Sequence, residues 1–244
     1  MVFTEKITND VYMIGDYVQN MNLSINVYLI NEKYPTLIDA GSLSVIPQIK
    51  EEIEKIIPLK DIKYIFLTHE HPDHIGGLPE LISDAYDAKI IASKHIEVHL
   101  GFMGIAGRII SVSGGETFDI GNDTIKIYYT PIETLGTISF YLENRKILFS
   151  GDYFGQIEKE FTPRVNVPTN ELINQIIAFH DGLGYKTSDI KKYLGPFLKT
   201  QVKIIAPGHG SVITNDIEQI MKTTINAKLK GSEKGGLWKK LFGR

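Results

Sequence analysis

The sequence contains no cysteine among its 244 residues. This absence excludes disulfide bonds, thiolate metal sites, iron–sulfur clusters held by cysteine, and cysteine nucleophiles. A metal ion bound by side chains in this protein must therefore be held by histidine and carboxylate groups.

Long apolar runs and an excess of positive charge are also missing. No stretch of about 18 apolar residues occurs, so no membrane-spanning segment or stable membrane insertion is expected. Residues 1–16 mix charged and apolar side chains and lack the apolar core of a secretory signal, which favours a cytoplasmic protein. The formal net charge of −3 gives no broad basic field, so nucleic acid is not an expected partner.

The apolar residues that are present, 43% of the chain, are enough for a sizeable core. Short apolar runs bounded by turn residues predict strands at 25–30, 36–39, 63–68, 88–93, 124–129, 139–144, 146–150 and 202–207. Helical spacing predicts helices at 44–57, 75–84, 169–180 and 187–199. This pattern indicates one α/β domain over residues 1–230, with two sheets and helices outside them in a four-layer αββα sandwich.

Residues 231–244 differ in composition from the rest of the chain. A glycine-rich stretch precedes a short basic segment that contains the only tryptophan, Trp238. This amphipathic, basic C-terminal tail could form one or two helical turns that bind a partner protein or an anionic surface. The alternative is an unstructured terminus.

Four potential metal ligands, His69, His71, Asp73 and His74, lie within six residues and follow an apolar run. Side chains at alternate positions of an extended segment point the same way, so His69 and His71 can share one ion. Asp73 and His74 lie at the turn into the next helix and can face a second ion. Burying this many polar groups requires compensation that a metal supplies, so the motif predicts a metal site.

Further ligands are expected downstream, where other predicted strands end. Glu133 follows IKIYYTP, Asp152 follows KILFSG and His209 follows VKIIAPG. One carboxylate can bridge two ions about 3.5–4 Å apart. We assign Asp152 as this bridge.

The remaining histidines are weaker candidates. His95 and His99 are four residues apart in a segment, 93–100, that favours a helix, and an exposed or half-buried helix face is the expected role. His180 ends a predicted helix, where an imidazolium would interact favourably with the helix dipole. The alternative for His180 is an approach to the metal site. The glycine-rich loop 101–107 is either a plain connection or a wall of the site.

Five motifs carry a resemblance to a known superfamily. They are NVYLI…LIDAG (26–41), THEHPDHIGG (68–77), TPIETLGTISFYL (130–142), ILFSGD (147–152) and IAPGHG (205–210). Over nearly all of residues 1–230 the sequence resembles the metallo-β-lactamase superfamily. The resemblance implies the metallo-β-lactamase fold, and it implies that Asp39 anchors the histidine loop from outside the ligand set.

One branch of that superfamily, the flavodiiron proteins, is similar in a further motif, SGDYFG (150–155). Its ligand pattern is H-x-E-x-D-H followed by H, D and H, whereas this chain has H-x-H-x-D-H followed by E, D and H. Glu133 thus stands where hydrolases of the superfamily usually carry histidine. The resemblance implies His69, His71 and Glu133 on one iron, with Asp73, His74 and His209 on the other. Asp152 and an oxo or hydroxo group would bridge the two.

The extra carboxylate at Glu133 favours iron over zinc. Three ionised carboxylates and one hydroxide balance two divalent ions. A negative charge about 4 Å from an ion favours its +3 state by about 4 kcal/mol at an effective dielectric constant of about 20. Hard oxygen ligands suit iron or manganese, whereas zinc has no redox chemistry. The alternative is a dinuclear zinc hydrolase of ester, thioester or phosphodiester bonds.

Flavodiiron proteins reduce dioxygen or nitric oxide with electrons from a flavin in an attached domain. These 244 residues show no such domain and no flavin site, so the chain resembles stand-alone oxygen-binding diiron proteins, some of them associated with bacterial chemotaxis. The resemblance implies dioxygen, or nitric oxide, as ligand. The protein would be a sensor that signals to a chemotaxis receptor, or a reductase with a separate redox partner. It also implies a homodimer, and Tyr153 is expected to wall the site or to be ordinary core.

Overall fold

The computed structural model describes residues 2–230, in which the strands form two sheets. The first sheet has the order β1-β2-β3-β4-β5-β6-β7. Its strands are β1 (Val2–Lys6), β2 (Val11–Val18), β3 (Leu23–Ile30), β4 (Thr36–Ile38), β5 (Tyr64–Phe66), β6 (Lys89–Ser93) and β7 (Ile109–Val112). The second sheet has the order β12-β11-β10-β9-β8. Its strands are β8 (Thr117–Asp119), β9 (Thr124–Tyr129), β10 (Ile138–Leu142), β11 (Ile147–Gly151) and β12 (Ile204–Pro207).

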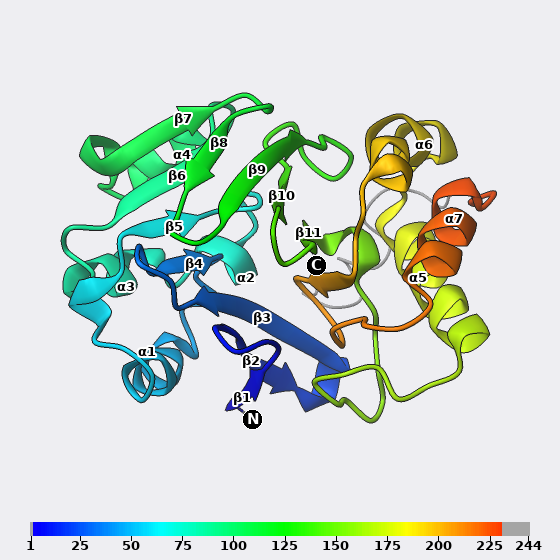
Figure 1. Cartoon of the computed structure of the whole chain (residues 1–244), viewed down its shortest axis with the longest axis horizontal. Helices are drawn as coiled ribbons and strands as arrows, with labels where there is room; N and C mark the ends of the chain where they lie inside the picture. The colour runs from blue at the N-terminus through cyan, green and yellow to red at the C-terminus, as the bar shows by residue number, and fades with distance from the viewer. Residues whose placement is uncertain (1, 231–244) are drawn as a thin grey trace.

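Helices cover the outer face of each sheet, as Figure 1 shows. On the first sheet lie α1 (Ile46–Glu54), α3 (Leu78–Asp84) and α4 (Glu97–Phe102), and on the second lie α5 (Thr169–Leu183), α6 (Thr187–Leu194) and α7 (Ile217–Asn226). The short helix α2 (Pro72–Ile75) follows β5. Within residues 2–230, no helix combines the length and the apolarity needed to cross a membrane.

Strand β3 carries large apolar side chains on both faces over residues 27–30. All eight of its residues are buried. Val27 and Leu29 pack with the helices outside the first sheet, while Tyr28 and Ile30 point into the layer between the sheets. Alternate residues of a strand point to opposite faces, so the part of the strand that is covered by apolar layers on both sides is apolar throughout.

The layer between the two sheets is built from large side chains of both. The rings of Phe66 and Phe140 lie 5.2 Å apart, as do those of Tyr28 and Phe149. Each pair joins a strand of the first sheet to a strand of the second. The predicted four-layer αββα sandwich is thereby confirmed.

Five strand ends meet at one edge of the sandwich. Strand β4 runs parallel to β5, and β11 runs parallel to β12. Strand β9 has the direction of β11, because both are antiparallel to β10. The loops that follow these strands carry Asp39, the 68–77 motif, Glu133, Asp152 and His209. Topology therefore gathers residues that lie up to 170 positions apart in the chain.

Two predicted helices differ from the structure. The helix predicted over 75–84 begins at Pro72 and is divided into α2 and α3 at Gly76 and Gly77. A side chain at Gly77 would place its Cβ only 2.4 Å from the carbonyl oxygen of Ala40, so glycine lets this junction approach the end of β4. The helix predicted over 187–199 ends at Leu194 and continues as a 3₁₀ segment from Gly195 to Lys199, which contains a proline.

The expected helix at 93–100 is also shifted along the chain. Helix α4 begins at Glu97, so His95 lies in the turn before it and does not share a helix face with His99. Both histidines are exposed. The predicted tail at 231–244 lies outside the described residues.

Candidate metal centre

The structure brings together all seven candidate ligands in two groups. His69, His71, Glu133 and Asp152 form the first group, and Asp73, His74 and His209 form the second. Within each group the ligand atoms lie within 4.8 Å of one another. The two groups are those implied by the sequence resemblance, with Asp152 placed by distance in the first. That these side chains bind metal stays a prediction.

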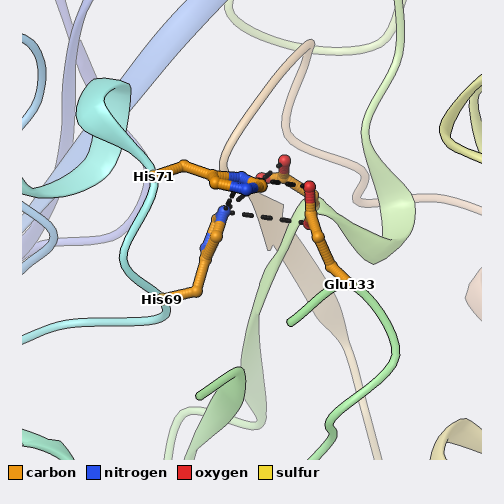
Figure 2. Close-up of side chains that lie close together, drawn as sticks. His69, His71 and Glu133 are labelled. Carbon is orange, nitrogen blue, oxygen red and sulfur yellow. Dashed lines mark hydrogen bonds and ion pairs between the residues drawn. The ribbon is translucent and has the colours of Figure 1, made fainter. Parts of the chain in front are cut away.

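In the first group, two histidines of one loop face Glu133 of another, as Figure 2 shows. His71 Nδ1 lies 2.9 Å from His69 Nε2 and 3.2 Å from Glu133 Oε1. His69 Nε2 lies 3.8 Å from Glu133 Oε2. Donor atoms that share one ion at about 2.1 Å are separated by about 3.0–3.4 Å. The first group therefore fits a common ion after small side-chain movements.

The second group is connected to the first through Asp152. Asp73 Oδ2 lies 3.2 Å from His209 Nε2 and 3.7 Å from His74 Nε2. Asp152 Oδ1 lies 3.2 Å from His74 Nε2, while Asp152 Oδ2 lies 3.4 Å from His209 Nε2 and 3.9 Å from His69 Nε2. The Asp152 carboxylate thus contacts both groups, which is the arrangement a bridging ligand requires.

Several polar atoms at this centre are buried and, among the described residues, have no hydrogen-bond partner. They are both carboxylate oxygens of Asp73, Glu133 Oε1, Asp152 Oδ1 and His74 Nε2. Leaving such a group unpaired costs about 1–3 kcal/mol, and more when it is charged. A metal ion supplies the missing partner, so this donor set of imidazoles and carboxylates fits bound cations.

The electrostatics of the centre point to the same need for positive charge. Burial lowers the pKa of His69 well below its usual range and raises the pKa of Glu133, to which the Asp152 carboxylate adds. For His209, burial alone would lower the pKa, but the carboxylates of Asp152 and Asp73 raise it to about 10. The protons held this way balance carboxylate charge, and bound cations would displace them.

Hydrogen bonds behind three of the histidines fix which ring nitrogen faces the centre. His74 Nδ1 donates to Asp39 Oδ2 at 2.8 Å, and His209 Nδ1 donates to the carbonyl oxygen of Ser24 at 2.7 Å. His69 Nδ1 lies 3.0 Å from the hydroxyl of Thr68. Each ring is therefore held with Nε2 toward the centre.

Two residues next to the ligand loops were not found from the sequence. The hydroxyl of Tyr185 donates to Glu133 Oε2 at 2.8 Å. The hydroxyl of Thr134 donates to Glu70 Oε2 at 2.7 Å, which ties the loop of Glu133 to the histidine loop. The partners lie 52 and 64 positions apart, so only the tertiary fold reveals them.

Tyr153 and His180 form a buried pair beside Asp152. Tyr153 is fully buried in the core under α5, and its hydroxyl donates to the carbonyl oxygen of Thr130. His180 Nε2 donates to the carbonyl oxygen of Tyr153. Burial lowers the pKa of His180 to about 4. The idea of a charged imidazolium at the helix end is therefore wrong, because His180 is held neutral in the core.

Two apolar residues of the segment 101–107 pack on the core of the first sheet. Ile105 is buried, and Met103 is half-buried, against the core between the first sheet and its helices. Whether this segment also walls the site stays a prediction.

Solved structures with the same fold are flavodiiron proteins. A flavodiiron protein from Giardia intestinalis has a TM-score of 0.83 at 23% identity, over 91% of this chain and 58% of that one. A flavoprotein from Thermotoga maritima has a TM-score of 0.79 at 25% identity, over 91% and 60%. The fold is that of the metallo-β-lactamase-like domain of flavodiiron proteins.

A family profile described as "ODP family beta lactamase" matches residues 23–210. The chain belongs to this family.

Curated relatives agree with this placement. An uncharacterized protein of Methanocaldococcus jannaschii is 30% identical over 89% of this chain and 58% of its own length. An anaerobic nitric oxide reductase flavorubredoxin of Salmonella arizonae is 29% identical over 82% and 43%. A rubredoxin-oxygen oxidoreductase of Megalodesulfovibrio gigas is 28% identical over 64% and 40%. The chain thus spans about half the length of these relatives.

Proposed function

We propose that the chain holds two iron ions at this centre and binds dioxygen, or nitric oxide, there. One iron would be held by His69, His71 and Glu133, and the other by Asp73, His74 and His209, with Asp152 and a solvent-derived oxygen between them. The names of two relatives, an anaerobic nitric oxide reductase and a rubredoxin-oxygen oxidoreductase, support this ligand class.

The position of Glu133 is the observation that carries the proposal. Its Oε1 lies 3.2 Å from His71 Nδ1, so it adds a third carboxylate to a centre that already contains Asp73 and Asp152. An added negative charge stabilises a trivalent ion over a divalent one. A metal that changes oxidation state gains from this charge, whereas zinc does not.

The roles of the chain's own residues follow from their contacts. Asp152 lies between the two groups and would hold both ions at a fixed separation. Asp39, Thr68 and Ser24 orient the histidine rings. When bound, the iron ions would supply reversible oxidation and the affinity for a diatomic gas.

Two roles fit such a centre. A sensor needs only one binding event and a signalling partner, for which a chemotaxis receptor is our prediction. A reductase needs repeated electron delivery by a redox partner such as the one named for the rubredoxin-oxygen oxidoreductase. A homodimer and a cytoplasmic location are further predictions from the sequence, as is a separate role for the tail at 231–244.

The test is anaerobic iron loading followed by an optical spectrum before and after exposure to oxygen. We expect about two iron ions per chain and a new visible absorption band after exposure. The protein purified from iron-supplemented cells should also contain iron. Stoichiometric zinc without iron, together with no visible absorption after air exposure, would contradict the proposal.

A dinuclear zinc hydrolase is the second candidate. The four imidazoles of His69, His71, His74 and His209 favour it, because imidazole is a common zinc ligand. In that case a metal-activated water would attack an ester, thioester or phosphodiester bond. Assaying the di-zinc form against generic esters, thioesters and phosphodiesters distinguishes the two candidates, since rapid turnover would favour the hydrolase.

A further inference from the structure

The two oxygens of Glu133 have different surroundings. Oε2 accepts a hydrogen bond of 2.8 Å from the hydroxyl of Tyr185. Oε1 faces His71 Nδ1 at 3.2 Å and, within residues 2–230, is buried without a hydrogen-bond partner. Oε2 also lies 3.8 Å from His69 Nε2, so the phenol competes with a metal ion for this oxygen, whereas Oε1 has no such competing donor.

The end of helix α5 explains why Tyr185 reaches Glu133. Gly184 adopts a left-handed conformation, with φ of 72°, directly after Leu183. The N–H of Gly184 donates to the carbonyl oxygen of Asp181, and the N–H of Tyr185 donates to that of His180. These two bonds define a Schellman motif, in which the residue after the glycine packs on the last helical turn. Accordingly, the Tyr185 ring lies 5.5 Å from that of His180.

The surroundings of Tyr185 hold its hydroxyl in place. Its ring lies 5.9 Å from that of Tyr153, whose carbonyl oxygen accepts the hydrogen bond from His180. Tyr185 is 3% exposed, and the Glu133 side chain is 5% exposed. Bulk water therefore has little access to Glu133 and cannot readily replace the phenol as hydrogen-bond donor. The hydrogen bond from Tyr185 to Glu133 is supported by the end of α5, which lies outside both ligand loops.

We propose that Tyr185 is a positioning residue that holds Glu133 as a one-oxygen ligand and so keeps a coordination position open at the first metal. The inference rests on the proposed dinuclear metal centre. A carboxylate with both oxygens free can occupy two positions on one ion. With Oε2 bound by the phenol, Glu133 occupies one position, and the second is left for a small ligand such as dioxygen.

The test compares cobalt(II)-loaded wild type with Y185F and with Y141F as a matched control. Tyr141 is also a buried tyrosine beside the same core, but its hydroxyl donates to the carbonyl oxygen of Gln201. The visible d–d absorption of cobalt(II) weakens as its coordination number rises. We expect weaker absorption in Y185F, because Glu133 would bind through both oxygens, and the wild-type spectrum in Y141F.

A wild-type spectrum in Y185F would overturn the inference, and so would the same weakening in Y141F. If Y185F does not fold, a crystal structure of the cobalt-loaded wild type decides instead. Glu133 should have one oxygen bonded to cobalt and the other within hydrogen-bond distance of Tyr185. Two bonded oxygens would refute the inference. Cobalt content is read separately, since fewer than two ions per chain in the wild type would refute the dinuclear centre itself.

Discussion

His74 Nδ1 donates a hydrogen bond of 2.8 Å to Asp39 Oδ2, although the two residues lie 35 positions apart. Asp39 also accepts a hydrogen bond of 2.7 Å from the backbone N–H of Thr68. It follows β4 with a positive φ of 61°, a conformation that aspartate and asparagine adopt more readily than most residues. One buried carboxylate thus fixes both ends of the loop that carries His69, His71 and Asp73.

Replacing Asp39 by asparagine should weaken metal binding. Asparagine tolerates the positive φ, but it is uncharged and is a poorer acceptor for His74 and Thr68. Loss of such an outer partner typically costs about 10–100-fold in metal affinity, and we expect that range for D39N. Competition with a chromogenic chelator measures the affinity.

The control for this experiment is D123N. Asp123 is also buried and is paired with Arg145, but it lies outside both ligand groups. D123N should lower the stability of the fold and leave the metal affinity close to that of the wild type. An unchanged affinity in D39N would show that Asp39 does not support the centre.

Replacing Glu133 by glutamine should raise the reduction potential of the iron-loaded protein. Glutamine retains an oxygen ligand but removes one negative charge from the first group. This charge favours the oxidised ion by about 4 kcal/mol, which corresponds to roughly 170 mV for a one-electron couple. A redox titration followed by visible absorption measures the shift.

E70Q is the matched control for E133Q. Glu70 lies between His69 and His71 in the chain but hydrogen-bonds to Thr134 and belongs to neither ligand group. The reduction potential of iron-loaded E70Q should shift far less than that of E133Q. Equal shifts in the two variants would mean that Glu133 does not act as a ligand.

The parts of the fold that could be predicted from the sequence are those with strong local patterns. The predicted strand at 124–129 coincides with β9, and the buried runs that became β3, β5 and β6 were found within two residues. The candidate ligands were found because each follows an apolar strand, and the topology then places those strand ends at one edge. At these loops the sequence pattern, an apolar strand followed by a candidate ligand, is enough to find the residues that the fold brings together.

Two of the missed strands, β8 and β1, depend on their neighbours. Strand β8 has only three residues, of which none is fully buried, and it exists through pairing with β9. Strand β1 is likewise a half-exposed edge strand whose charged residues conceal its pairing with β2. The contact of Tyr185 with Glu133 depends on a helix end brought from another part of the chain. Cross-strand and long-range contacts of this kind leave no periodic pattern in the sequence.

Removing Asp152 should have a larger effect on metal content than removing His71. Asp152 lies within 3.9 Å of ligand nitrogens in both groups, whereas His71 belongs to the first group alone. We expect H71A to retain one tightly bound ion and D152A to lose affinity for both. Metal analysis after dialysis against a weak chelator measures this, and a D152A protein that keeps one ion as tightly as H71A would contradict the bridging role.

Because of His180, the fold should be less stable in mild acid than at neutral pH. The Nε2 of His180 donates to Tyr153, and its Nδ1 is buried without a partner among the described residues, so protonation would bury an unpaired charge. Burial lowers its pKa from 6.5 to about 4. Below pH 6.5 the unfolded chain therefore binds a proton that the folded chain does not, and the free energy of unfolding falls as the pH falls toward 4.

Between pH 7.5 and pH 5, this one histidine should lower the free energy of unfolding by about 2 kcal/mol. Urea unfolding of wild type and H180Q at the two pH values measures it. Acid-linked losses common to both proteins, such as metal release, cancel in the comparison. The wild type should lose about 2 kcal/mol more than H180Q on acidification, while H95Q, altered at an exposed histidine, should behave like the wild type. Equal losses in wild type and H180Q would show that His180 is not the buried neutral group that its contacts indicate.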